Sequence, residues 1–230
     1  MSLPFQVLHE DNHLLVVNKP AGLATMGLSP DQPSLVRAAK QYIKQKYRKP
    51  GNVYLGIVSR LDAAASGVIV LARTSKAAAR LTEQFRSREV EKTYLAVVAG
   101  RLDKFGELVD YLKKDDALQR MIVVPEGSAG AKLARLRFEN LSHGPQGTLA
   151  KVQLETGRKH QIRVQFASRG HPIVGDRKYG SRARFAGAQN EPAIALHAYQ
   201  LRFAHPISRA DLAFTAPLPG PWRRLGAALE

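Results

Sequence analysis

The chain contains no cysteine, so neither a disulfide framework nor a cysteine-ligated zinc or redox site can form. No apolar run approaches the length that spans a bilayer, and the N-terminus lacks a basic segment followed by an apolar signal core. We therefore expect a cytoplasmic protein with no membrane partner. Its 230 residues are enough to bury a full core without a metal or disulfide staple.

Acidic residues are scarce relative to basic ones. The 19 Asp and Glu residues face 35 Lys and Arg residues, which gives a formal net charge of +16. Because cations that neutralise phosphates release counterions, this excess favours a polyanionic partner. No segment pairs a broad apolar face with a basic one, so nucleic acid is favoured over a membrane surface. A generally basic soluble protein is the alternative.

Several catalytic signatures are absent as well. Among the seven histidines only His9 and His13 have HxxxH spacing, with Glu10 between them, and they lie in a predicted hairpin rather than on the helix that would place both rings on one metal. There is neither a GxSxG motif nor a phosphate-binding loop. We therefore expect no metal and no cofactor. Any chemistry here would depend on carboxylate, phenol and guanidinium groups.

The pattern of elements predicts an α+β fold with a largely antiparallel sheet, because hairpins alternate with only occasional helices. In the N-terminal part, a hairpin is expected over residues 5–19 and helices over about 34–47 and 74–88, with Ser34 and Thr74 or Ser75 as N-caps. Residues 103–118 are polar and are predicted to be irregular. The remaining elements are strands near 92–100, 121–124, 193–204 and 211–216, a hairpin made by AKLARLRFENLS and TLAKVQLE, a helix from about 159 to before 170, and a short helix after Pro221.

The segment from Gly56 to Ala72 is the most informative. Arg60 and Asp62 are two residues apart in an extended stretch, so their side chains share one face and Leu61 takes the other. The run GVIVLA that follows is typical of a strand buried on both faces. Asp62 is then either a functional carboxylate at the mouth of a core strand or a surface ion-pair residue.

Two further segments carry side chains that a core does not need, Lys92-Thr93-Tyr94 and TGRKHQIR at 156–163. In the second, Ile162 and Phe166 form an i, i+4 packing pair. Arg163 lies beside this stripe, where it either needs a carboxylate partner at the core boundary or extends its charge to solvent.

These segments together resemble the RluA-type pseudouridine synthases over nearly the whole chain. The shared motifs are Asn18-Lys19-Pro20-Ala21-Gly22, Arg60-Leu61-Asp62 with Ser66-Gly67, Lys92-Thr93-Tyr94, TGRKHQIR, and Gly170-His171-Pro172-Ile173-Val174-Gly175-Asp176 with Tyr179-Gly180. The resemblance implies the pseudouridine synthase fold, with two sub-lobes around a basic cleft. It also implies an isomerase that cleaves the N-glycosidic bond of uridine in RNA, rotates the base and reattaches it through carbon 5.

The resemblance also implies residue roles. Asp62 would be the catalytic carboxylate, acting as nucleophile at the ribose or as base in a glycal-type route. Arg163 would pair with Asp62, Tyr94 would stack on the target base, Arg60 would help to flip the uridine out of its stack, and Ile162 would form an apolar pocket wall. RNA contacts are expected from Arg60, Lys19, Arg158, Lys159, His160 and Gln161.

The chain departs from the family pattern at Ser59, where His is usual, and at Ala63, Ala64 and Ala65, which replace polar residues. It begins almost directly at the catalytic domain, so we expect a single domain over 1–230 without the S4-like domain of some relatives. Such a protein would recognise a local stem-loop of rRNA or tRNA, with a monomer as the default. The alternative is a non-catalytic RNA-binding or RNA-chaperone protein on the same scaffold, which the alanine-rich loop favours.

Overall fold

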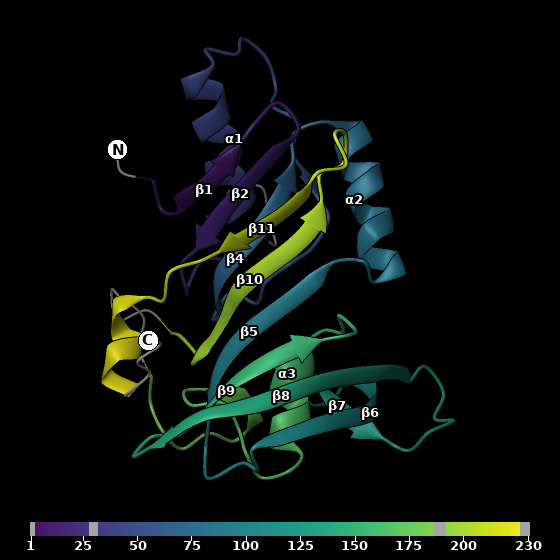
Figure 1. Cartoon of the computed structure of the whole chain (residues 1–230), viewed down its shortest axis with the longest axis vertical. Coiled ribbons are helices and arrows are strands. Elements are labelled where there is room, and N and C mark those ends of the chain that lie inside the picture. The colour runs from purple at the N-terminus through teal and green to yellow at the C-terminus, as the bar shows by residue number, and fades with distance from the viewer. Residues whose placement is uncertain (1–2, 28–31, 186–191, 226–230) are drawn as a thin grey trace. The chain divides into compact units, whose positions relative to one another are not determined.

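The computed structural model describes residues 3–27, 32–185 and 192–225. The chain divides into two compact units, one made of residues 1–91 and 198–218 and the other of residues 92–197 and 219–230. Figure 1 shows both units, with strands and helices of each labelled. In the ranges described, no helix is long and apolar enough to cross a membrane.

The first unit is built on a sheet whose central strands are almost completely buried. In spatial order the strands are β1 (Gln6–Glu10), β2 (Leu14–Lys19), β4 (Ser66–Ala72) and β10 (Leu196–Ala204), with β11 (Asp211–Thr215) paired to β10 and β3 (Gly56–Ile57) paired to β4. The predicted hairpin is confirmed by the antiparallel pair β1–β2. Every residue of β4 is buried, as the sequence GVIVLA predicts.

Two capped helices belong to this unit. The side chain of Ser34 accepts from the Arg37 amide at the start of α1 (Leu35–Lys46), and that of Thr74 accepts from the Ala77 amide at the start of α2 (Ser75–Ser87). Both predicted helices are thereby confirmed. Gln84 of α2 is buried, and its amide bonds both the N–H and the carbonyl of Ala204, which fixes the helix to the end of β10.

The second unit is built on a run of antiparallel strand pairs. The strands lie in the order β5 (Glu91–Val98), β9 (Gly147–Leu154), β8 (Lys132–Gly144), β6 (Phe105–Asp115) and β7 (Arg120–Val124). The predicted hairpin is the pair β8–β9.

The predicted strands 193–204 and 211–216 are confirmed as β10 and β11, and the short helix after Pro221 as the 3-10 helix η2 (Gly220–Leu225).

The prediction that residues 103–118 are irregular is wrong, because β6 occupies most of this segment. The strand has a weak sequence pattern because only Leu108 and Leu112 are buried on its inner side, with the charged Asp110 between them. Asp110 is tolerated there because its carboxylate accepts from Gln165 Nε2 at 2.7 Å and forms an ion pair with Arg169 at 2.8 Å.

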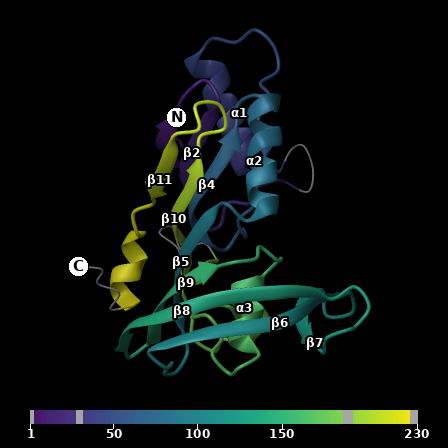
Figure 2. The same cartoon turned by 45° about the vertical axis from the view of Figure 1, so that its right-hand side comes forward.

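The partners of Asp110 belong to α3 (Gln161–Ala167) and the residues that follow it. Figures 1 and 2 both show α3 on one side of β8 and β6. Phe166 of the helix lies against Phe138 of β8, with ring centroids 5.5 Å apart. The helix therefore covers one face of this sheet and carries Arg163 with it. The predicted α+β class and largely antiparallel sheet are confirmed.

Candidate active site

Asp62 lies in the loop between β3 and β4, immediately before the turn at Ala63 and Ala64. Leu61 is buried, Asp62 is half-buried and Arg60 is exposed, as the predicted alternation requires. The Ala65 amide donates to the Asp62 carbonyl at 3.1 Å, which closes the turn. A short, hydrogen-bonded loop thus joins Asp62 to the fully buried strand β4.

The buried side chain of Lys19 is hydrogen-bonded to the main chain of this loop. It has 0% exposure, and its Nζ donates to the carbonyls of Pro20 and Leu23 (both 2.8 Å), Ala63 (3.3 Å) and Ala65 (2.6 Å). A side chain with no exposed surface cannot contact RNA in this conformation. The predicted RNA contact of Lys19 is therefore replaced by a structural role, which joins the end of β2 to the Asp62 loop.

Burial also changes the titration of Lys19. Loss of hydration lowers the pKa of its ammonium to about 7, and the nearby negative charge of Asp62 opposes that shift. The Lys19 ammonium and the Asp62 carboxylate therefore interact electrostatically.

The backbone before Asp62 is held by Thr25, which sequence analysis did not single out. Its buried hydroxyl donates to the Leu61 carbonyl at 2.8 Å and accepts from the Leu61 amide at 3.1 Å. After Asp62, the Gly22 amide donates to the Ala63 carbonyl at 2.8 Å. Because these contacts use main-chain atoms of the loop, its shape does not require polar side chains at Ala63 or Ala65.

Arg163 in the second unit has a carboxylate partner, as its position at the core boundary predicts. It is 7% exposed; its Nε donates to Asp176 Oδ2 at 2.7 Å and its Nη2 to Oδ1 at 2.9 Å. Its Cζ lies 5.0 Å from the centre of the Tyr179 ring. This two-point contact fixes the plane of the guanidinium. The pairing of Arg163 with Asp62, which is in the other unit, stays a prediction.

Tyr179 is held in turn by its neighbours. Its hydroxyl accepts from the Met121 amide at 3.0 Å and lies 2.8 Å from His160 Nδ1. His160, predicted to contact RNA, is half-buried against this ring and has a left-handed backbone with φ of 53°. The sequence carries the motif that contains Asp176 and Tyr179, but only the fold shows that these two residues contact and orient Arg163.

Gln161 also has a structural role in place of its predicted RNA contact. It is 3% exposed; its Oε1 accepts from Thr156 Oγ1 at 2.7 Å and from the Arg158 amide at 3.0 Å, and its Nε2 donates to the Arg135 carbonyl at 3.0 Å. These bonds shape the turn into α3. Arg158 is half-buried and donates from Nε to the Leu133 carbonyl, whereas Lys159 is exposed.

The two remaining predicted site residues are in the second unit. Tyr94 is half-buried on β5, opposite Val152 of β9. Ile162 is 4% exposed on α3, next to Arg163. A phenol on a strand and an apolar residue on the helix are compatible with the predicted stacking and wall roles, which stay predictions.

Residues 13–168 match the family described as RNA pseudouridylate synthase, and the chain belongs to that family. The predicted family, fold and enzyme class, an isomerase of uridine in RNA, are thereby confirmed at the level of the family. The basic cleft stays a prediction.

Two named relatives and one solved structure support the same family assignment. The chain is 37% identical over its full length to ribosomal large subunit pseudouridine synthase D of Nitrosomonas europaea, of which it spans 66%. It is 37% identical over 99% of its length to the protein of the same name from Xanthomonas campestris pv. campestris, of which it spans 70%. The fold is similar to that of human RNA pseudouridylate synthase domain containing 4, with a TM-score of 0.77 at 26% identity over 97% of this chain and 94% of that one.

Proposed function

We propose that this chain isomerises a uridine of large-subunit ribosomal RNA to pseudouridine, with Asp62 as the catalytic carboxylate. The observation that carries the proposal is the Asp62 loop, whose main chain is held on both sides by Lys19, Thr25 and Gly22. The names of the relatives support ribosomal RNA as the substrate.

The chemistry requires a carboxylate in a fixed position. Asp62 either attacks the ribose or removes a proton in a glycal-type route, and both need its ionised form. The uracil leaves C1′ and returns through carbon 5, so the reaction is an isomerisation that needs no co-reactant. The guanidinium of Arg163, which Asp176 orients, would pair with the Asp62 carboxylate and hold it in position. Tyr94 would stack on the base, Arg60 would help to expel it, and Ile162 would line the pocket.

The test of this function compares Asp62→Ala with Asp211→Ala. Asp211 is an exposed aspartate on β11 in the same unit, so its replacement makes the same chemical change away from the loop. With ribosomal RNA as substrate, Asp62→Ala should form no pseudouridine while it retains most of its RNA affinity. Asp211→Ala should retain both. Pseudouridine formation by Asp62→Ala at the wild-type rate would disprove the role of the carboxylate.

The second candidate function is a non-catalytic RNA-binding protein, which the three alanines after Asp62 favour. Mapping of carbodiimide-reactive pseudouridines in cells with and without this chain separates the two functions. Loss of a ribosomal site supports the synthase, loss of a transfer-RNA site changes the substrate, and an unchanged map supports the non-catalytic protein.

We further propose that the chain acts in the cytoplasm as a monomer and recognises a local stem-loop. Support comes from its basic charge, which suits direct contact with RNA phosphates. A minimal stem-loop that contains the target uridine should be modified. If only the intact folded RNA is modified, recognition extends beyond the stem-loop.

A further inference from the structure

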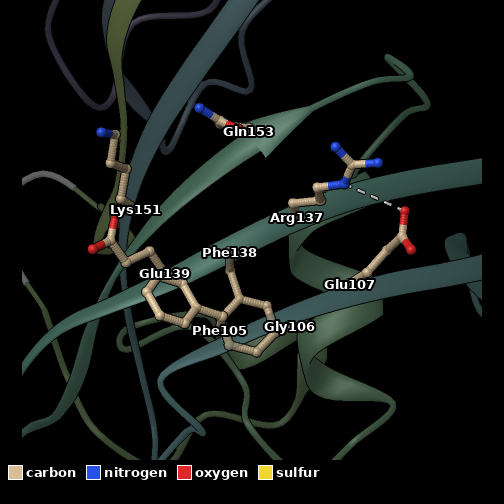
Figure 3. A pocket seen from close by; sticks show the side chains of 8 residues that line it. All are labelled: Phe105, Gly106, Glu107, Arg137, Phe138, Glu139, Lys151 and Gln153. Atoms are coloured by element: carbon tan, nitrogen blue, oxygen red, sulfur yellow. Dashed lines mark ion pairs between the residues drawn. The ribbon is translucent and has the colours of Figure 1, made fainter.

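The sheet of the second unit carries a hollow of about 440 Å³ that the proposed chemistry does not use. Figure 3 shows its lining, which comes from three adjacent strands, β6, β8 and β9: Phe105, Gly106, Glu107, Arg137, Phe138, Glu139, Lys151 and Gln153. In the register of these strands, Phe105 lies opposite Glu139, which lies opposite Lys151. A volume of this size falls in the range of small-molecule sites.

The hollow lies on the face of the sheet that α3 does not cover. Side chains alternate along a strand, so Phe105, Glu139 and Lys151 share one face, and Phe138 takes the other. The ring of Phe138 is the one that lies against Phe166 of α3. Tyr94 is opposite Val152, which is opposite Phe138, so Tyr94 also belongs to the α3 face. A ligand in the hollow would therefore not be the base that stacks on Tyr94.

An exposed aromatic ring stands at one end of the hollow. Phe105 is 65% exposed, and the Nζ of Lys104 lies 5.6 Å from the centre of its ring. Close to it, the side chains of Glu139, Lys151 and Gln153 make no hydrogen bond or ion pair within the part of the chain that the structure describes. Glu107, by contrast, already pairs with Arg137 at 3.6 Å. The hollow thus offers one aromatic face together with an uncommitted acceptor and uncommitted donors.

A nucleobase matches this combination. It has a flat face that stacks on an aromatic ring and an edge with both donors and acceptors, and it is attached to an anionic phosphate. We propose, on the basis of the proposed function, that the hollow binds one unpaired nucleotide of the substrate RNA away from the reacting uridine. The base stacks on Phe105, and its phosphate faces the ammonium groups of Lys151 and Lys104.

Glu139 gives this contact a sequence preference. A carboxylate accepts hydrogen bonds from exocyclic amino groups, as glutamate does from the N4 amino group of cytosine. Uracil has no exocyclic amino group and offers only its N3–H as a donor. Glu139 therefore favours a cytidine, adenosine or guanosine in the hollow over a uridine.

The direct test measures binding of short fluorescent oligocytidine strands, which cannot be isomerised, to the full chain. Phe105→Ala should weaken binding by about fivefold to a hundredfold, the range found for loss of one stacked base, and Phe105→Trp should restore it. The matched control is Val109→Ala. Val109 is exposed on the same strand and the same face but does not line the hollow. Glu139→Gln should reduce the preference for oligocytidine over oligouridine.

Equal oligocytidine affinities of Phe105→Ala and Val109→Ala would overturn the proposal. A wild-type dimer that Phe105→Ala converts to a monomer in light scattering would also overturn it, because a second copy would then be the occupant. Pseudouridine formation by the wild-type chain tests the proposed function separately. If no pseudouridine forms while Phe105→Ala still weakens oligocytidine binding, the proposed function fails and the nucleotide site stands.

Discussion

Lys19 stabilises the loop that carries Asp62, although its own side chain is buried away from the proposed substrate. A buried ammonium is costly unless its protons are bound, and four main-chain carbonyls surround this one. Two of these carbonyls belong to the residues just after Asp62. The position of the carboxylate therefore depends on a lysine with no access to solvent.

Replacement of Lys19 by methionine should lower the free energy of unfolding, because several buried carbonyls lose their donor. The expected loss is about 1–3 kcal/mol, and pseudouridine formation should slow because the Asp62 loop loosens. Denaturant titration and a product assay measure the two effects. Lys40→Met, at an exposed position of α1, is the control and should change neither.

The same variant tests the pKa of Lys19. Between about pH 7, its folded value, and pH 10.5, the ordinary value, the unfolded chain binds more protons than the folded chain. The free energy of unfolding that Lys19 contributes should therefore rise with pH in this window, by up to about 1.4 kcal/mol per pH unit. Denaturant titrations of the wild type and Lys19→Met at several pH values measure the difference. Parallel pH curves would show that the four carbonyls keep the ammonium protonated.

The sequence was a good guide to some residues and a poor guide to others. The alternation predicts that Arg60 and Asp62 share one face and that Leu61 takes the other. The burial of Leu61 alone among the three agrees with this prediction, which follows from local backbone geometry. The burial of Lys19 and Gln161 could not be predicted, since long polar side chains are mostly exposed. Only the folded loops supply the carbonyls and hydroxyls that permit it.

At the level of elements, the start of β4 is fixed by its close contact with β10. Gly67 has a φ of +121°, and a Cβ at this position would lie 2.2 Å from the carbonyl oxygen of Ala198. No side chain fits there without a shift of the backbone. Strand β4 can therefore approach β10 this closely only because Gly67 has no side chain.

Gly67→Ala should therefore destabilise the fold by roughly 2–4 kcal/mol, because it combines a strained φ with a backbone clash. Thermal or denaturant unfolding measures the loss. Gly51→Ala is the matched control, since a Cβ at Gly51 meets nothing within 4 Å and should be nearly neutral. Equal stability of the two variants would mean that β4 and β10 separate at little cost.

Helices and apolar strands of this chain were predictable, and β6 was not. The caps of α1 and α2 and the apolar run of β4 carry strong local patterns. In β6, Asp110 interrupts the apolar alternation, and its partners Gln165 and Arg169 come from a segment about 55 residues later. A pattern that depends on such distant partners cannot be recognised within a short window.

For the molecule as a whole, the charge of +16 predicts a strong salt dependence of RNA binding. Affinity for RNA should fall at least about tenfold between roughly 50 and 200 mM salt, because bound phosphates release counterions. Binding titrations over this range give the slope. Arg60→Ala or Lys159→Ala should reduce the slope by about one, whereas Lys76→Ala, an exposed change on α2, should leave it unaltered. An affinity independent of salt would contradict an electrostatic interface.

The sequence by itself determined the fold class, the family and the residues around which the chemistry is proposed, because these depend on local patterns and on motifs in a fixed order. The tertiary structure decided what those residues do for one another. It buried Lys19 under the Asp62 loop, gave Arg163 the carboxylate of Asp176, and placed Phe105 beside an open hollow. The physical reason is that these contacts join residues far apart in the chain, and only folding brings their polar atoms within hydrogen-bonding distance.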